Sequence, residues 1–206
     1  MRLLVGASLR SAWSRHAMSV TGEGVARRHA SEGREDSTEG LLDVSGRLDL
    51  TRDMDVDFGA RLSRRVEPRG AVDAPDVSAE PIRVEARELD LAARRVVGRF
   101  RTTLRAEHRT FDFHDGETEA GDEIDQDHRD RAVSRLSARA DYAVTPALAL
   151  FVQAATNRRD YRRAEGRDSA GVEALAGVDF ELGALVRAQV AAGHVRQAFD
   201  HPGVSD

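Results

Sequence analysis

Apolar and polar residues alternate along most of this chain. In 171–182, GVEALAGVDFEL, the even positions are apolar and the odd positions are mostly small or charged. Strict alternation over this length predicts a β-strand with one apolar and one polar face. The pattern recurs in segments 41–50, 54–65, 98–109, 132–144, 148–156 and 184–192, and more faintly in 3–13, 18–28 and 82–93. We therefore predict about ten strands.

The predicted strands are long. They have about 10–13 residues each, whereas the strands of globular proteins average about 5–6 residues. About eleven residues tilted by about 45° cover roughly 25 Å, which is the height of the apolar band on an outer-membrane β-barrel. The strand length therefore favours a barrel wall over a sandwich. In segment 82–93 the alternation changes phase between Ala86 and Leu89, which indicates either a β-bulge or a wrongly assigned register.

The segments between the strands alternate between short and long. Short turns are predicted near 15–16, 52–53, 93–96, 145–146 and Gly183, and long polar loops at 31–38, 67–81, 112–130 and 162–170. This alternation is typical of an up-and-down meander with its long loops at one end. We predict an all-β fold, in which an antiparallel up-and-down meander of about ten long strands forms a complete or partial transmembrane β-barrel.

The whole chain, 1–206, is predicted to be one β-barrel domain. An even number of strands would place both termini at the long-loop end, whereas single-chain outer-membrane barrels normally have both termini in the periplasm. We therefore expect truncation at both ends of a larger barrel. The apolar run Leu3–Ala7 is too short for the core of a signal peptide.

The composition excludes some classes of protein but does not distinguish a water-soluble protein from a β-barrel. No run of about 18 apolar residues is present, which excludes a transmembrane helix. The mean hydropathy of −0.49 and the 33% of charged residues suit a water-soluble protein and a β-barrel equally, because barrel strands alternate. The net charge of −5 gives no reason to expect nucleic-acid binding. The absence of Cys is compatible with an oxidising compartment.

Charged residues occupy the polar positions of several predicted strands. We expect seven of them to line a water-filled lumen, namely Arg47, Arg61, Arg105, Arg139, Arg187, Glu173 and Asp179. Charged rings of this kind tune the selectivity of a pore. The alternative interpretation is that these residues form cross-strand ion pairs that satisfy one another, and the two interpretations are compatible.

The loop 112–130 contains the densest cluster of acidic residues. Its spacing lacks the Gly at the sixth position of an EF-hand loop, so we expect a solvated extracellular loop. The alternative is a divalent-cation site that bridges lipopolysaccharide phosphates. A hydrolase site at the barrel mouth would use His108, Asp112, His114 and Asp115, but no nucleophile or base geometry accompanies them. We therefore predict no catalytic, metal or cofactor-binding residue.

The stretch 158–206 resembles a known family. It has a strand that ends in Asp-Tyr, an Arg-Asp-Ser loop, a Gly-Val-Asp-Phe strand, and a strand that closes on an aromatic-Asp-x-Pro segment. In these features it is similar to the outer-membrane porins of the putative β-barrel porin 2 family of alphaproteobacteria. The resemblance implies an integral outer-membrane barrel without catalytic residues or a cofactor. Its partners would be outer-membrane lipid, lipopolysaccharide and the barrel assembly machinery.

Two classes of function remain open. The first is an outer-membrane β-barrel, either porin-like, with a charged lumen that passes small solutes, or structural. The second is a soluble or secreted β-meander binding protein, in which the same alternation would face a hydrophobic core. The direction in which the apolar residues point distinguishes them. A hydrolase at the barrel mouth is a third, weaker hypothesis.

Overall fold

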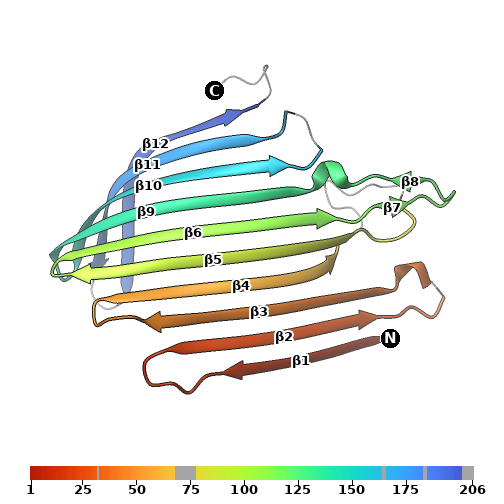
Figure 1. The fold of residues 1–206 in the computed structure, drawn as a ribbon, viewed down its shortest axis with the longest axis horizontal. Helices are drawn as coiled ribbons and strands as arrows, with labels where there is room; N and C mark the ends of the chain where they lie inside the picture. Colours follow the sequence, from red (N-terminus) through yellow and green to blue (C-terminus); the bar gives the residue numbers. More distant parts are fainter. Residues whose placement is uncertain (32, 68–77, 164–165, 183–184, 201–206) are drawn as a thin grey trace.

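The computed structural model describes residues 1–31, 33–67, 78–163, 166–182 and 185–200. Ten long strands dominate this part of the chain (Figure 1). They are β1 (Arg2–Arg10), β2 (Ala17–Arg27), β3 (Ser37–Asp49), β4 (Met54–Val66), β5 (Arg83–Val97), β6 (Phe100–Phe113), β9 (Arg131–Thr145), β10 (Leu148–Tyr161), β11 (Ser169–Leu182) and β12 (Val186–Phe199). A small hairpin of β7 (Gly116–Glu117) and β8 (Glu123–Ile124) and two single-turn 3₁₀ helices, η1 (Gly33–Glu35) and η2 (Asp127–Arg129), lie between them.

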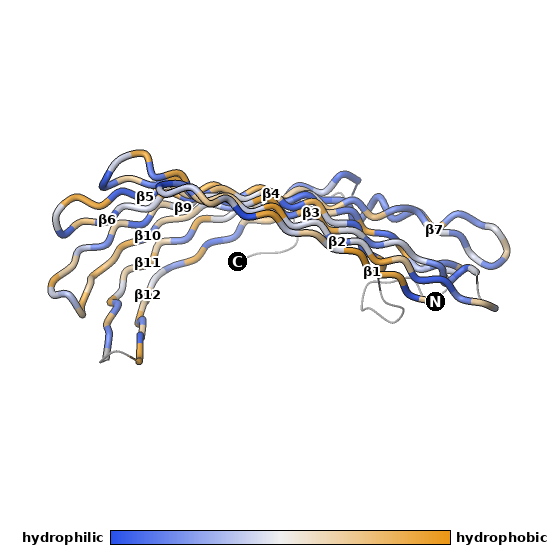
Figure 2. Tube along the Cα trace, turned by 90° about the horizontal axis from the view of Figure 1, so that it is seen from below, coloured by the Kyte–Doolittle hydropathy of each residue, from blue (hydrophilic) through white to orange (hydrophobic). Residues whose placement is uncertain are grey.

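The ten long strands form one antiparallel sheet in which each strand pairs with its neighbours in sequence. The order is β1-β2-β3-β4-β5-β6-β9-β10-β11-β12, and only the β7–β8 hairpin is skipped. This confirms the predicted all-β meander. Strands β1 and β12 form the two outer edges, and within the described residues they do not pair with each other. The described sheet is therefore an open, curved layer (Figures 1 and 2). No helix among the described residues is long and apolar enough to span a membrane.

Four of the predicted short turns are described. Those at 15–16 and 52–53 fall between strands as expected, the one predicted at 145–146 begins at the last residue of β9, and Gly183 lies outside the described residues. The turn predicted at 93–96 is wrong, because β5 continues to Val97 and the chain reverses at Gly98 and Arg99. Gly98 has a φ of 60°, a backbone conformation that glycine adopts without a steric penalty. The glycine, rather than the end of the alternation, was the signal for this turn.

The bulge, one of the two explanations for the change of phase between Ala86 and Leu89, is also wrong. Strand β5 pairs with β4 and with β6 without a register shift, and the one irregularity recorded among the long strands lies between Leu148 and Ala149. The change of phase has a different cause. The apolar run on one face of β5 stops at Leu89, and Arg87 continues that face, while Ala86 is packed on the other face with 1% of its surface exposed.

The registers give the sheet two faces of opposite character. One, the apolar face, carries a continuous set of large hydrophobic side chains: Leu3, Val5, Leu9, Val20, Leu42, Val44, Leu48, Val56, Phe58, Leu62, Leu89, Leu91, Phe100, Leu104, Leu136, Tyr142, Leu150, Val152, Val172, Val178, Phe180, Val186 and Val190. The other, the charged face, carries Asp43, Arg47, Asp55, Asp57, Arg61, Glu88, Asp90, Arg94, Arg101, Arg105, Glu107, Arg109, Arg135, Arg139, Asp141, Glu173, Asp179 and Arg187.

Burial is the reverse of what a water-soluble protein shows. Leu89, Leu136 and Val152 on the apolar face are 57%, 55% and 59% exposed, and no second layer covers this face in the described part of the chain (Figure 2). Every buried residue among those of the ten long strands whose burial the structure describes lies instead on the same side as the charged residues: Ser37, Ala86, Ala92, Phe113, Asp141, Phe151, Ala155, Ser169 and Gly171. Side chains crowd on the concave side of a curved sheet, so this burial indicates that the charged face is the inner one.

The strands are staggered along the sheet. Hydrogen-bonded partners followed from Arg10, the last residue of β1, lead across nine strand pairings to Gln197. Strand β12 begins at Val186, at the same end of the sheet as Arg10. The row from Arg10 therefore meets β12 eleven residues further along, at Gln197. The stagger of about 1.2 residues per strand corresponds to a tilt of about 40°, given a rise of about 3.3 Å and a strand spacing of about 4.8 Å. Strands that close a barrel tilt by about 35–45°.

Candidate functional site

The charged face is the candidate functional site, because it gathers the polar side chains that the meander could present to a solute. All seven residues predicted to line a lumen lie on it. Each forms an ion pair within the described residues, at 4.0 Å or less: Arg47 with Asp49 and Asp55, Arg61 with Asp43, Arg105 with Asp90, Arg139 with Asp141 and Asp179, Arg187 with Glu181, and Glu173 with Arg135. Mutual pairing, the alternative interpretation of these charges, is therefore present. Of the seven, only Arg139 and Asp179 pair with each other.

Arg139 is the centre of a packed group on this face. Its Nε and Nη2 donate to Asp141 Oδ1 at 2.9 and 2.8 Å, and its Nη2 also donates to Asp179 Oδ2. The guanidinium lies 3.7 Å above the ring of Phe151, which is 4% exposed. Gln189 Nε2 completes the group by donating to Asp179 Oδ1 at 2.8 Å. The contacts join strands β9, β10, β11 and β12.

Phe151 was not expected here, because it is aromatic at a position where the alternation of β10 requires a polar residue. Its cross-strand partner explains the exception. Phe151 pairs with Gly177, and a Cβ atom on that glycine would lie 2.7 Å from the ring and 2.3 Å from the backbone oxygen of Val190. The ring therefore fills the space above the glycine and provides the surface on which Arg139 stacks. A glycine opposite an aromatic residue was the available sequence signal.

A second network lies on strands β3, β4 and β5. Arg47 Nη2 is 3.0 Å from Asp55 Oδ1, and Arg94 Nη1 is 3.4 Å from Asp55 Oδ2. Arg94 also lies 3.6 Å from Asp57. Asp55 is thus held between two guanidinium groups, with 13% of its side chain exposed. Arg94 was missed at the sequence level because the predicted turn at 93–96 removed it from the strand.

Of the hollows on the charged face, two adjoin the Arg139 group and the Asp55 network. One, of about 570 Å³, lies between the two networks and is lined by Arg47, Asp55, Arg94, Val96, Arg101, Thr103, Arg139, Asp141 and Asp179. The other, of about 530 Å³, lies toward the short turns, where Arg99, Pro146 and Arg187 contribute to its lining. Arg101, Asp141 and Asp179 line both, so the two hollows form one continuous charged depression.

The opposite, long-loop end of this face is held by Arg129. Its Nη1 and Nη2 donate to the two oxygens of Glu67 at 2.9 and 2.6 Å, and the side chains are 8% and 13% exposed. The guanidinium also stacks 4.1 Å above Phe113, and Asp130 Oδ1 accepts a hydrogen bond of 2.7 Å from the Phe113 backbone nitrogen. These contacts tie the start of β9 to the ends of β4 and β6. Part of the loop 67–81 lies outside the described residues.

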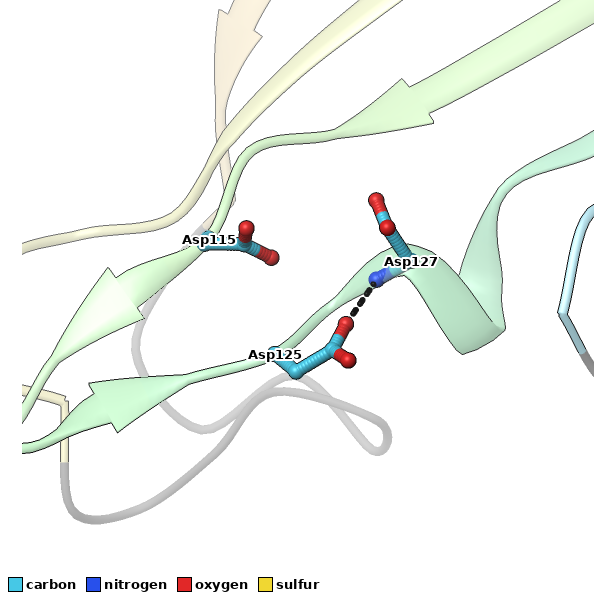
Figure 3. Close-up of side chains that lie close together, drawn as sticks. All are labelled: Asp115, Asp125 and Asp127. Atoms are coloured by element: carbon cyan, nitrogen blue, oxygen red, sulfur yellow. Dashed lines mark hydrogen bonds between the residues drawn. The ribbon is translucent and has the colours of Figure 1, made fainter.

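The acidic loop brings three carboxylates together (Figure 3). Possible ligand oxygens of Asp115, Asp125 and Asp127 lie within 4.8 Å of one another. However, the protein itself already engages each of them. Asp115 Oδ1 accepts from the Gln126 backbone nitrogen at 2.8 Å, Asp125 Oδ1 accepts from that of Asp127 at 2.8 Å, and Arg163 Nη1 lies 2.7 Å from Asp127. The arginine supplies the positive charge that a cation would otherwise provide.

The residues considered for a hydrolase site do not converge. His108 lies on the apolar side of β6, where its Nδ1 is 2.9 Å from Ser134 Oγ. Asp112 is four residues further along the same strand, which corresponds to about 13 Å. His114 Nε2 instead approaches Glu85 at 3.5 Å, and Asp115 belongs to the acidic loop. Within the described residues these groups form no catalytic arrangement.

The antiparallel meander agrees with the strand pattern that the resemblance implied, although the described strands do not close into a barrel. No curated protein and no solved structure gives a significant match to the chain. The family described as "Putative beta-barrel porin 2" matches residues 2–206, which is nearly the whole chain. The chain therefore belongs to the Putative beta-barrel porin 2 family.

Proposed function

We propose that this protein is an integral outer-membrane β-barrel wall whose charged face lines a water-filled lumen for the passive diffusion of small hydrophilic solutes. The main observation behind the proposal is that a single sheet has an uncovered apolar face on one side and a packed, charged inner face on the other. A soluble β-meander would have to cover residues such as Leu91, Leu104 and Val152, which are 51%, 51% and 59% exposed. Lipid covers such a face without a second protein layer.

The shape of the apolar band supports the membrane environment independently. A hydrogen-bonded row that starts at Leu9 passes through Val20 and Val44 to Leu89, but on later strands it reaches His108, Ser134 and Arg158. The band therefore runs obliquely to the hydrogen-bonded rows. Strands tilted by about 40° require this obliqueness if the band is to remain level with a bilayer. In a soluble sheet, nothing requires the apolar positions to shift from strand to strand by the same amount as the stagger.

The proposal also covers the partners of the chain. The apolar face would contact outer-membrane lipid. At the long-loop margin of the apolar face, Arg87 lies next to Leu89 on β5, and Arg64 lies on the adjacent strand. Guanidinium groups at this margin can reach lipopolysaccharide phosphates. The barrel assembly machinery would insert the protein. The family suggests a membrane protein without enzymatic activity, and we propose no catalytic role for any residue.

Swelling of proteoliposomes tests the proposed function. The refolded chain should enter lipid vesicles and make them permeable to small uncharged sugars, with a rate that falls as the size of the sugar increases. In buffer without detergent or lipid it should aggregate, because one whole face is apolar. Vesicles that incorporate the folded protein but remain impermeable would contradict the lumen, and a stable monomer in plain buffer would contradict the membrane wall.

A further inference from the structure

The charged depression contains one arginine whose side chain has neither an ion pair nor a hydrogen bond among the described residues. Arg47, Arg94 and Arg139 each have aspartate partners in the described structure. The side chain of Arg101, in contrast, has no such partner among the described residues, although Asp141 is its register partner on β9. Asp141 Oδ1 instead accepts two hydrogen bonds from Arg139.

The surroundings of Arg101 favour an anion. The hollow between the two networks is lined by four arginines and three aspartates, and Arg101 is the one of these arginines that has no ion pair among the described residues. Thr103 lies two residues from Arg101 on the same face and also lines the hollow, and its hydroxyl has no hydrogen-bond partner among the described residues. The distance along the strand between the two residues is about 6.6 Å. A group with several acceptor oxygens can therefore contact both.

We propose that Arg101 and Thr103 form a binding subsite for a small anion with a carboxylate or phosphate group. The guanidinium offers a planar pair of donors that matches two oxygens of such a group, and the Thr103 hydroxyl donates to a third oxygen or to the same group. Arg101 also lines the second hollow, so the subsite lies where the two hollows meet.

This inference rests on the proposed lumen, since it names the class of solute that the charged face would favour. The binding of inorganic phosphate tests it separately from permeation. The full chain, refolded in octyl glucoside, is titrated into inorganic phosphate, and the ³¹P linewidth gives the dissociation constant. We expect binding in the millimolar range, weakened about 10-fold by Arg101→Gln and by less than about 3-fold by Arg101→Lys, because lysine keeps the charge but loses the paired donors.

Arg159→Gln is the matched control. Arg159 lies on the same side of the sheet as the charged residues. Its side chain has no ion pair or hydrogen bond among the described residues, and it does not line either hollow. Its substitution should change the dissociation constant by less than about 2-fold, since exposed charges outside the site are screened. An equal loss in both glutamine variants would overturn the subsite, as would the absence of phosphate binding by the unmodified chain. Vesicle swelling without phosphate binding would contradict this inference and leave the proposed function intact.

Discussion

The two faces of the sheet share one backbone but follow opposite rules. On β9, Leu136 is 55% exposed on the apolar face, whereas the carboxylate of Asp141 on the charged face is among the most buried groups of the described chain. In a water-soluble protein the leucine would be buried and the aspartate exposed. The comparison shows that the alternation in the sequence predicts which residues share a face of the sheet. It does not predict whether that face contacts water or lipid.

The largest expected effect comes from placing the same charge on each face in turn. Leu136→Arg should destabilise the protein in lipid by about 2–4 kcal/mol, because an arginine on the lipid side near the midplane loses its hydration. Ser137→Arg, one residue further along β9 on the charged face, should change stability by less than about 1 kcal/mol. Urea titration of both variants in lipid vesicles measures the difference. Equal effects would mean that the two faces meet the same solvent.

Glycine positions sharpen the comparison of the faces through packing. Gly177→Ala should cost about 1–3 kcal/mol, since the new Cβ would meet the Phe151 ring and the Val190 backbone oxygen, and the backbone oxygen cannot move aside easily. Gly22→Ala is the control on the apolar side of β2, because nothing lies within 4 Å of a Cβ there. It should be neutral or stabilising by up to about 1 kcal/mol. The same unfolding titration checks both, and a neutral Gly177→Ala would show that the charged face is loosely packed.

Within the charged face, packed and exposed ion pairs should differ. Arg139→Ala removes the cation that holds Asp141 and Asp179, and should cost about 1–2 kcal/mol because it leaves the buried carboxylate of Asp141 without this partner. Arg61→Ala breaks a pair whose arginine side chain is 52% exposed, and should cost less than about 1 kcal/mol. Unfolding free energies in detergent test this order. If Arg61 proved the more costly to remove, the Arg139 group would not be the packed centre of this face.

The smallest effect lies in a short turn outside the strands. The hydroxyl of Thr51 donates a hydrogen bond to the Asp53 carboxylate at 2.6 Å, and mainly for this reason the pKa of Asp53 lies below its usual value of 3.8. Because this folded-state pKa is below the unfolded one, the associated stabilisation is complete above about pH 4 and is lost as the pH falls through the lowered pKa. Thr51→Val should raise the pKa toward its usual value in an NMR titration of the carboxyl carbon. An unchanged pKa would contradict the assigned cause.

Most of the fold was predictable, because a period of two in the sequence fixes both the strands and the membership of their faces. The errors in β5 share one physical cause. The apolar band ends before the strand does, so Arg87 and Glu85 occupy apolar-face positions and look like a change of phase. The apolar band and the strand end at different positions, and hydrophobic alternation indicates only where the band ends.

The charged face was predictable as a set of residues but not as a set of contacts. The seven predicted residues lie on one face because each occupies a polar position in the alternation of its strand. Which of these residues pair depends on the stagger between strands, and the stagger cannot be predicted from the sequence of a single strand. The contact of Arg139 with Asp179 therefore required the register of three strands. The packing of Arg129 on Phe113 similarly joins segments whose separation in the sequence gave no signal.

The central claim, that lipid meets one face and water the other, is tested most directly by cysteine scanning along 134–142 of β9. The chain has no native cysteine, so every single-cysteine variant carries one label site. In lipid vesicles, a membrane-impermeant maleimide should modify the odd positions, such as Ser137, while fluorophores at the even positions, such as Leu136 and Ala138, should be quenched by brominated lipid. A two-residue period with opposite phases for the two reagents is the predicted result. Access of the aqueous reagent to both sets, or the absence of lipid quenching at the even positions, would contradict the account.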